Sequence, residues 1–320
     1  MLLYAGTASK LSFKYFILKD TVKKLKPWSL SAGNFILKKE TSETKRNNIE
    51  FHSENIKQIS VHVPKHLKLL TDEQLGHYLA GLIDSNGYFS FKQRLIIELK
   101  FMDVSLAYYI KKRLGYGQVK KVKDKFIYLL VISNKDGLIK VINLINGKLR
   151  NINKINQIIN NILVHPNYLK ENLIIKKNLT SDLNNYWFVG FSDVSANFQI
   201  KLKKNSPIIN SQESISDLKI KLNLQIIKED NDILLYIKNY FGGHILYDKL
   251  NNNYIYNSDS LGSAKKLINF FDKYHLQSSK YVNYLKWRKS YILIQNQLTE
   301  KSLQKINKFF RIEIQYKIKS

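Results

Sequence analysis

The sequence predicts an α+β fold made of two copies of one unit, helix–strand–strand–helix–strand–strand–helix, with antiparallel sheets. One observation is a Gly-centred helix pattern at residues 71–86 that leads directly into a β-type run. Another is a similar pattern at residues 188–198, followed by the same order of elements. We expect the two helices to pack against each other at a pseudo-twofold axis.

The first helix has a clear start and an unusual middle. Thr71 can cap it, and Gln74, three residues on, completes a capping box. Small residues inside a helix cost stability compared with better helix formers. Ala80 and Gly81, with Gly190 in the second copy, therefore predict a helix-pair interface where another backbone comes very close.

The elements that follow are predicted from apolar periodicity and from turn signals. In the first copy they are strands at 88–93 and 95–101, a helix at 103–114, strands at 118–123 and 126–133, and helices at 135–146 and 151–163. In the second copy they are strands at 198–203 and 218–227, a helix at 230–241, strands at 244–248 and 254–257, and helices at 263–274 and 278–296. Each copy thus offers strand pairs with helices on one face.

Three segments of the chain are expected to differ in organisation. Residues 1–69 have weak periodicity and a polar run, so we expect an N-terminal extension or linker that is partly disordered. Residues 70–165 form the first repeat, and residues 166–320 contain a linker, the second repeat, a C-terminal helix and a tail. A longer loop around residues 204–216 is either a recognition loop or a disordered insertion.

The charge balance points to a polyanionic partner. The chain of 320 residues carries a formal net charge of +27 and has a sequence pI of about 9.8. That excess favours nucleic acid first and an anionic membrane surface second, with solvated lysine faces as the plainer alternative. No apolar run reaches the roughly 18 residues that a membrane span needs.

Two further features of the composition limit the possibilities. The chain has no Cys, which excludes disulfides, thiolate zinc sites and a Cys nucleophile. Its abundance of Lys, Asn, Ile, Tyr and Phe is what A/T-rich codons specify. We therefore expect a gene in mitochondria, or in a similarly A/T-rich genome.

Polar side chains alternate along several strands, which places them on one face of each sheet. Lysine suits phosphate contacts, and Gln, Asn and Arg can hydrogen-bond base edges. A solvated sheet face is the alternative for any single strand. The predicted nucleic-acid-binding residues are Lys92, Arg94, Lys100, Gln118 and Lys120 in the first repeat and Gln199, Lys201, Lys203, Lys219, Lys221, Asn223 and Gln225 in the second.

The two helix patterns resemble a known signature. Residues 79–87, LAGLIDSNG, agree in seven of nine letters with the motif of the LAGLIDADG homing endonuclease and RNA maturase family. Residues 188–196, FVGFSDVSA, resemble its looser second copy. The resemblance covers roughly residues 70–300. It implies the two-motif, single-chain form, in which two αββαββα repeats form a saddle and the protein is a monomer.

The resemblance also says where catalytic acids are expected. In the family, the eighth letter of each motif is acidic, and the two carboxylates hold divalent cations between them. Hydrolysis of phosphodiesters uses Mg²⁺, which needs hard oxygen ligands. In this chain the eighth letters are Asn86 and Ser195, and neither can be an anion. The resemblance therefore implies a degenerate site without metal-binding carboxylates, in which Asn86 and Ser195 are the residues that would contact any bound cation.

Four other residues are candidates for a place near that centre. Asp84 and Asp193 hold the sixth letters, and two residues along a helix turn a side chain by roughly 200°. We expect both to be structural. Lys280 resembles a basic residue that the family often carries near its cleavage centre, and Lys154 is a weaker match. Either lysine could instead be a solvated surface residue.

These observations favour an RNA maturase that assists splicing of its host mitochondrial group I intron without cutting DNA. Binding RNA requires shape and charge, and no cofactor. The alternative is a homing endonuclease, active or weak, that makes a double-strand cut in intronless DNA and needs Mg²⁺. A third possibility is a degenerate protein with residual DNA binding. The expected partners are group I intron RNA and, in the alternative, double-stranded DNA.

Overall fold

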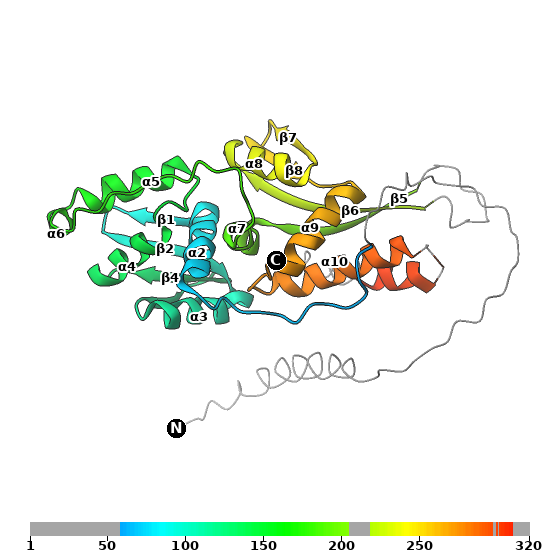
Figure 1. Ribbon diagram of the computed structural model, residues 1–320, viewed down its shortest axis with the longest axis horizontal. Helices are drawn as coiled ribbons and strands as arrows, with labels where there is room; N and C mark the ends of the chain where they lie inside the picture. Colours follow the sequence, from blue (N-terminus) through cyan, green and yellow to red (C-terminus); the bar gives the residue numbers. More distant parts are fainter. Residues whose placement is uncertain (1–57, 205–217, 297–298, 300, 310–320) are drawn as a thin grey trace, which may run out of the picture. The chain divides into compact units, whose positions relative to one another are not determined.

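The computed structural model describes residues 58–204, 218–296, 299 and 301–309, and Figure 1 shows their elements. All of them belong to one unit that begins at Lys57. The repeat order predicted for the chain is present twice in this part. Among the described residues, no helix is both long and apolar enough to cross a membrane.

The first repeat comprises the elements α2 to α6. Its bounds are α2 (Asp72–Asn86), β1 (Gly87–Ser90), β2 (Arg94–Lys100), a 3-10 turn (Phe101–Asp103), α3 (Val104–Leu114), β3 (Gln118–Lys121), β4 (Ile127–Ile132), α4 (Lys135–Ile145), α5 (Ile152–Ile158), a π-helical turn (Ile159–Leu163) and α6 (Pro166–Leu169).

The second repeat comprises the elements α7 to α10. Its bounds are α7 (Trp187–Ser195), β5 (Asn197–Lys204), β6 (Leu218–Lys228), α8 (Asp232–Phe241), β7 (His244–Asp248), β8 (Asn253–Asn257), α9 (Leu261–Lys273) and α10 (Lys280–Gln295). Residues 301–309 are also helical.

The two sheets have the same topology. In the described residues they are four-stranded, with the orders β1-β2-β4-β3 and β5-β6-β8-β7, and every neighbouring pair is antiparallel. Alternate residues of the central strands are buried under the helices, such as Leu95 and Ile97 in β2 and Leu222 and Leu224 in β6. The predicted α+β fold class is therefore confirmed.

The helix pair α2 and α7 lies between the two sheets (Figure 1). A Cβ added to Gly81 would lie 1.9 Å from the Trp187 carbonyl oxygen, and one added to Gly190 would lie 2.0 Å from that of Tyr78. Ala80 is fully buried. Backbone meets backbone at this crossing, as the small residues predicted.

The predicted capping box of α2 is present. Thr71 Oγ1 accepts a hydrogen bond from the Gln74 backbone N–H at 3.2 Å, and Gln74 Oε1 accepts one from the Thr71 N–H at 3.3 Å. Two free N–H groups at the helix start are satisfied in this way.

Among the predicted elements that are shorter than expected, two have a clear structural cause. Strand β1 ends at Ser90, because the Gln93 N–H donates to the Ser90 carbonyl and closes a turn with Gln93 at φ 47°. The helix predicted at 151–163 changes into a π-helical turn after Ile158. Around this change, the Gln157 side chain accepts a hydrogen bond from the Phe89 N–H, and the Asn161 side chain donates one to the Phe89 carbonyl. These side chains thus bind backbone groups of the edge strand β1 that no neighbouring strand in the described part of the chain pairs with.

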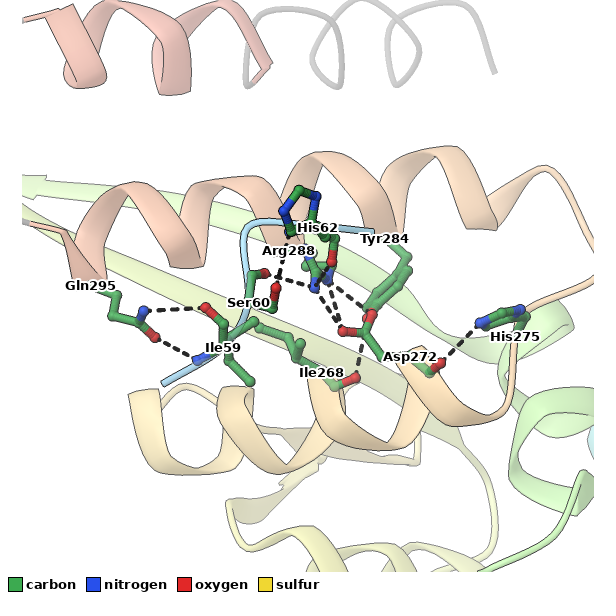
Figure 2. Close-up of polar contacts among 9 residues, drawn as sticks. All are labelled: Ile59, Ser60, His62, Ile268, Asp272, His275, Tyr284, Arg288 and Gln295. Atoms are coloured by element: carbon green, nitrogen blue, oxygen red, sulfur yellow. Dashed lines mark hydrogen bonds and ion pairs between the residues drawn. The ribbon is translucent and has the colours of Figure 1, made fainter. Parts of the chain in front are cut away.

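An extended segment, residues 58–70, ties the second repeat to the start of α2. Figure 2 shows its anchor, in which the buried Arg288 of α10 donates to the Ser60 and His62 carbonyls, both at 3.0 Å, and pairs with Asp272 of α9 at 2.8 Å. Gln295 accepts from the Ile59 N–H at 3.1 Å. The segment is thus fastened across α9 and α10 before the first repeat begins.

Candidate nucleic-acid interface

The sixth-letter aspartate of α2 is a buried anchor. Asp84 accepts hydrogen bonds from the backbone N–H groups of Arg150, at 2.8 Å, and Asn151, at 3.2 Å. It also accepts one from the indole N–H of Trp187, at 2.8 Å, which belongs to α7. Burial raises the pKa of Asp84 to about 6, against these hydrogen bonds, which lower it.

The second repeat has the same arrangement around Asp193. Its carboxylate accepts from the Gln277 N–H at 2.9 Å, from the Ser278 N–H at 3.2 Å and hydroxyl at 2.6 Å, and from the Tyr78 hydroxyl of α2 at 2.7 Å. Burial raises the pKa of Asp193. Each aspartate therefore fastens the start of the long helix region that follows and holds an aromatic side chain of the opposite central helix.

The eighth-letter residues do not meet each other. Asn86 is exposed at the end of α2, and its amide donates to the Glu98 carbonyl at 3.3 Å. Ser195, at the end of α7, has its hydroxyl hydrogen-bonded to that of Ser85. The structure thus brings Ser195 together with the seventh letter of the first motif, a residue that the sequence analysis did not single out.

Two lysines bind the carbonyl groups at the ends of these helices. Lys228 Nζ donates to the Ser85 carbonyl at 2.5 Å. Lys280 Nζ donates to the Ser192 and Val194 carbonyls at 3.2 and 2.6 Å. Both ammonium groups therefore lie at the carboxyl ends of the central helices, where the helix dipole favours a cation, although the Ser192 carbonyl also accepts from the Ala196 N–H at 2.9 Å.

Burial and mutual repulsion weaken the basicity of these lysines. The pKa of Lys280 is lowered to about 7, mainly by burial and in part by the charges of Lys100 and Lys228. The pKa of Lys228 is lowered to about 8, mainly by burial and in part by the charge of Lys154. The pKa of Lys154 is also lowered by burial. Lys100, Lys154, Lys228 and Lys280 form what we call the lysine centre.

The residues of the lysine centre do not fit a pair of magnesium ions. No cluster of three or more His, Asp or Glu side chains that could hold a metal occurs in the described part of the chain. Asn86 and Ser195 carry no charge, while the nearby Asp84 and Asp193 already accept three and four hydrogen bonds from protein donors. Ammonium groups repel Mg²⁺ and attract an anion such as phosphate, although the carboxylates of Asp84, Asp103, Asp193 and Glu229 also act on these lysines and offset part of their charge.

Lys228 is a site residue that the sequence analysis missed. The predicted strand stopped at residue 227, one position short of it. A signal was available, because residues 222, 224 and 226 are apolar and face the helices, and Lys228 continues that series. A lysine at the end of a buried strand face must find an acceptor or a phosphate.

The predicted polar residues of the first sheet share one face. Register places Arg94 and Lys100 of β2 on the face opposite the core, together with Gln118 and Lys120 of β3. Lys92 lies outside the strands, in the β1–β2 turn. The face is less polar than predicted, because Ile96, Leu129 and Val131 lie between the charged residues.

The amides of the second sheet bond mainly to one another. Gln199 donates to Gln225 at 2.9 Å, and Asn223 donates to Gln199 at 3.1 Å and to Asn257 at 2.8 Å. Asn223 is only 1% exposed. These amides therefore form a fixed ladder on the face that was predicted to contact bases.

The lysines of the same face lie beside that ladder. Lys201 and Lys221 stand opposite each other, and Lys221 forms an ion pair with Asp259 at 3.3 Å. Lys203 and Lys219 are opposite in the backbone register, and their side chains lie outside the described residues.

Comparison with known proteins identifies the family. The LAGLIDADG endonuclease family profile matches residues 188–291. The uncharacterized cox1 intron-2 37.2 kDa protein of Schizosaccharomyces pombe is 48% identical, over 96% of this chain and 95% of that protein. The intron-encoded DNA endonuclease aI3 of Saccharomyces cerevisiae is 28% identical, over 76% of this chain and 69% of that protein. The intron-encoded RNA maturase bI4 of the same yeast is 29% identical, over 67% of this chain and 32% of that protein.

Solved structures share the fold. The meganuclease I-SmaMI, bound to uncleaved target DNA in the presence of calcium ions, aligns with a TM-score of 0.54 and 20% identity, over 73% of this chain and 97% of that one. I-AabMI, bound to uncleaved DNA, aligns with a TM-score of 0.55 and 20% identity, over 74% of this chain and 98% of that one. On the strength of its sequence relatives, the profile match and the two-repeat fold, the chain belongs to the LAGLIDADG endonuclease family.

Proposed function

We propose that this protein is an RNA maturase of a mitochondrial group I intron and that it assists splicing of that intron without cutting DNA. The observation that carries the proposal is the lysine centre. Where the family resemblance leads one to expect cation-holding carboxylates, this chain has Asn86, Ser195 and a group of ammonium ions. Such a centre favours a phosphate of a bound strand over a metal ion.

Other features support this proposal. A formal charge of +27 suits the phosphate contacts that dominate nucleic-acid affinity. RNA is recognised through shape and backbone, so the proposed function needs no metal from the protein. The S. cerevisiae relative named RNA maturase, and the S. pombe relative named for a cox1 intron, agree with an intron-encoded protein of mitochondria. Because both motifs lie in one chain, we propose a monomer.

A splicing assay tests the proposal. Precursor RNA containing the protein's own intron is incubated at a Mg²⁺ concentration too low for rapid self-splicing, with and without the protein. We expect the protein to accelerate splicing and to bind the precursor with an affinity that falls steeply with salt. Equal splicing rates with and without the protein would contradict the proposal.

A pair of matched variants tests the lysine centre itself. Lys228→Met with Lys280→Met removes two charges at the centre, whereas Lys112→Met with Lys266→Met removes two exposed charges from α3 and α9. We expect the first pair to weaken RNA binding by about tenfold and the second by no more than about twofold, because only the first lies where a strand would cross. Equal losses would mean that the centre makes no specific contact.

The alternative is a Mg²⁺-dependent DNA endonuclease, which the relatives named as endonucleases favour. It is tested by incubating the protein with Mg²⁺ and intronless DNA that spans the exon junction, with I-SmaMI on its own target as the positive control. We expect no site-specific cut. A double-strand break at the junction would overturn the proposal that the protein acts on RNA alone.

A further inference from the structure

An exposed aromatic pair lies at the end of the first sheet where strand β2 finishes and strand β4 begins. Phe101 is 48% exposed and Phe126 is 81% exposed, and their ring centroids lie 6.4 Å apart with the rings nearly perpendicular. The Phe101 N–H donates to the Phe126 carbonyl at 2.9 Å, which fixes the two backbones together. Phe126 stands at the tip of the β3–β4 hairpin, between the exposed Lys125 and strand β4.

This pair is held beside the lysine centre. Phe101 directly follows Lys100, whose charge acts on Lys280. Phe101 also begins the 3-10 turn that ends at Asp103, and the Asp103 carboxylate accepts from the Ser279 N–H at 2.7 Å. Ser279 immediately precedes Lys280, so the turn is fastened to the start of α10 next to the centre.

A second aromatic pair lies beside Lys228, in the second sheet. The rings of Tyr247 and Tyr254 are 4.9 Å apart, and Tyr247 is 49% exposed. Tyr254 stands directly opposite Lys228 in the β6–β8 ladder. The second sheet therefore also ends in aromatic rings next to a lysine of the centre.

We infer that these two pairs, Phe101–Phe126 and Tyr247–Tyr254, stack on unpaired RNA bases on either side of a phosphate bound at the lysine centre. Aromatic rings stack on any base, but only on bases that are not already stacked inside a duplex. Exposed Lys123 and Lys125, beside Phe126, are opposite in charge to the phosphates of an RNA strand. The inference rests on the proposed function and deepens it: the ligand is RNA with unpaired nucleotides at its centre, rather than a continuous duplex.

The inference is tested with two synthetic RNA hairpins whose paired stems have the same sequence. One is fully paired, and the other carries a short bulge of 2-aminopurine, whose fluorescence falls when it stacks on an aromatic ring. We expect the protein to bind the bulged hairpin about tenfold more tightly than the paired one and to quench the bulge. Phe126→Ala should remove most of that preference, and Tyr247→Ala should reduce it.

Matched controls come from the same molecule. Phe91 is 83% exposed and stands beside Lys92, but in the β1–β2 turn at the opposite end of the sheet. Tyr108 is 54% exposed on α3. Phe91→Ala and Tyr108→Ala should keep both the preference and the quenching. Thermal melting of every variant should show an unchanged fold, as expected for exposed side chains.

The outcomes separate this inference from the proposed function. Equal, salt-sensitive binding of both hairpins by the unaltered protein would overturn the stacking and leave the proposed function standing. Equal losses of affinity in Phe126→Ala and Phe91→Ala would also overturn the stacking inference, because the loss would then not depend on a position near the lysine centre. If the protein bound neither hairpin, the stacking inference would be overturned, and the splicing assay would decide the proposed function separately.

Discussion

At the scale of single residues, the sixth-letter aspartates connect three parts of the chain. Asp193, on α7, receives donors from the start of α10 and from Tyr78 of α2. The Asp193 carboxylate accepts from backbone N–H and hydroxyl groups. If an asparagine replaced it, the side-chain NH₂ would face at least one of these donors and could not accept its hydrogen bond. A buried donor that loses its acceptor costs more than the hydrogen bond contributed.

We therefore predict that Asp193→Asn lowers the free energy of unfolding by about 2 kcal/mol. Urea denaturation followed by circular dichroism measures the change. The control is Asp124→Asn in the β3–β4 turn, where φ is 59°, because Asn tolerates that conformation as well as Asp. An Asp193 variant as stable as the control would mean that the carboxylate anchors nothing.

Some of the site was predictable residue by residue, and some was not. The loss of both eighth-letter acids is read directly from Asn86 and Ser195. That Ser195 meets Ser85 depends on how two helices are rotated about their axes at the crossing, which no local pattern specifies. Lys228 could have been found by following the alternation of β6 for one more residue.

At the scale of elements, the crossing of α2 and α7 depends on glycine. Because an added methyl group at Gly81 would lie 1.9 Å from a backbone carbonyl, the helices would have to separate. We predict that Gly81→Ala costs at least about 3 kcal/mol of unfolding free energy, as overpacking against backbone does in its severe cases. Thermal or urea unfolding measures it.

The matched control is a helical glycine with space around it. Gly262, in α9, has no heavy atom within 4 Å of the position a Cβ would take. Gly262→Ala should stabilise the protein by about 0.5–1 kcal/mol, because alanine is the better helix former. If both substitutions had the same sign, close approach would not be the reason for Gly81.

The segment at residues 58–70 gives a second prediction at this scale. Arg288 is its main anchor and holds two backbone carbonyls as well as Asp272 (Figure 2). Arg288→Met leaves that carboxylate without its cation, so the unfolding free energy should fall by about 3 kcal/mol. Limited proteolysis should then cut within residues 58–70 first. Unchanged protection there would show that other contacts hold the segment.

Element order was predictable because the repeats keep clear periodicities, but several ends were not. The turn at residues 91–93 carries alternating residues that continue the pattern of β1, and only its positive φ reveals the break. The π-helical turn after Ile158 depends on tertiary contacts of Gln157 and Asn161 with strand β1. Such contacts leave no trace in local sequence.

At the scale of the whole molecule, the lysine centre links pH to both stability and binding. In the folded protein the pKa of Lys280 is about 7 and that of Lys228 about 8, against 10.5 for an ordinary lysine. At pH values between these folded-state pKa values and 10.5, the two lysines hold more protons in the unfolded chain than in the folded protein. These two groups therefore make the free energy of unfolding rise with pH in that window. Asp84, raised from 3.8 to about 6, acts in the opposite direction below about pH 6.

Binding of RNA should respond to pH with the opposite sign. A phosphate stabilises the ammonium form, so Lys228 and Lys280 must take up protons when a strand binds. We predict that RNA affinity falls by about tenfold or more between about pH 6.5 and pH 8.5, a range in which an ordinary lysine stays charged. Fluorescence anisotropy at constant ionic strength measures the affinity, and calorimetry in buffers of different ionisation enthalpy counts the protons taken up.

The double variant Lys228→Met, Lys280→Met isolates the cause of that pH dependence. It should bind more weakly and with little pH dependence, whereas Lys112→Met with Lys266→Met should keep the full dependence. Because stability and affinity move in opposite directions between about pH 7 and pH 8.5, partial unfolding cannot imitate the predicted loss of affinity at high pH. A pH-independent affinity in the unaltered protein would place the bound phosphates away from the lysine centre.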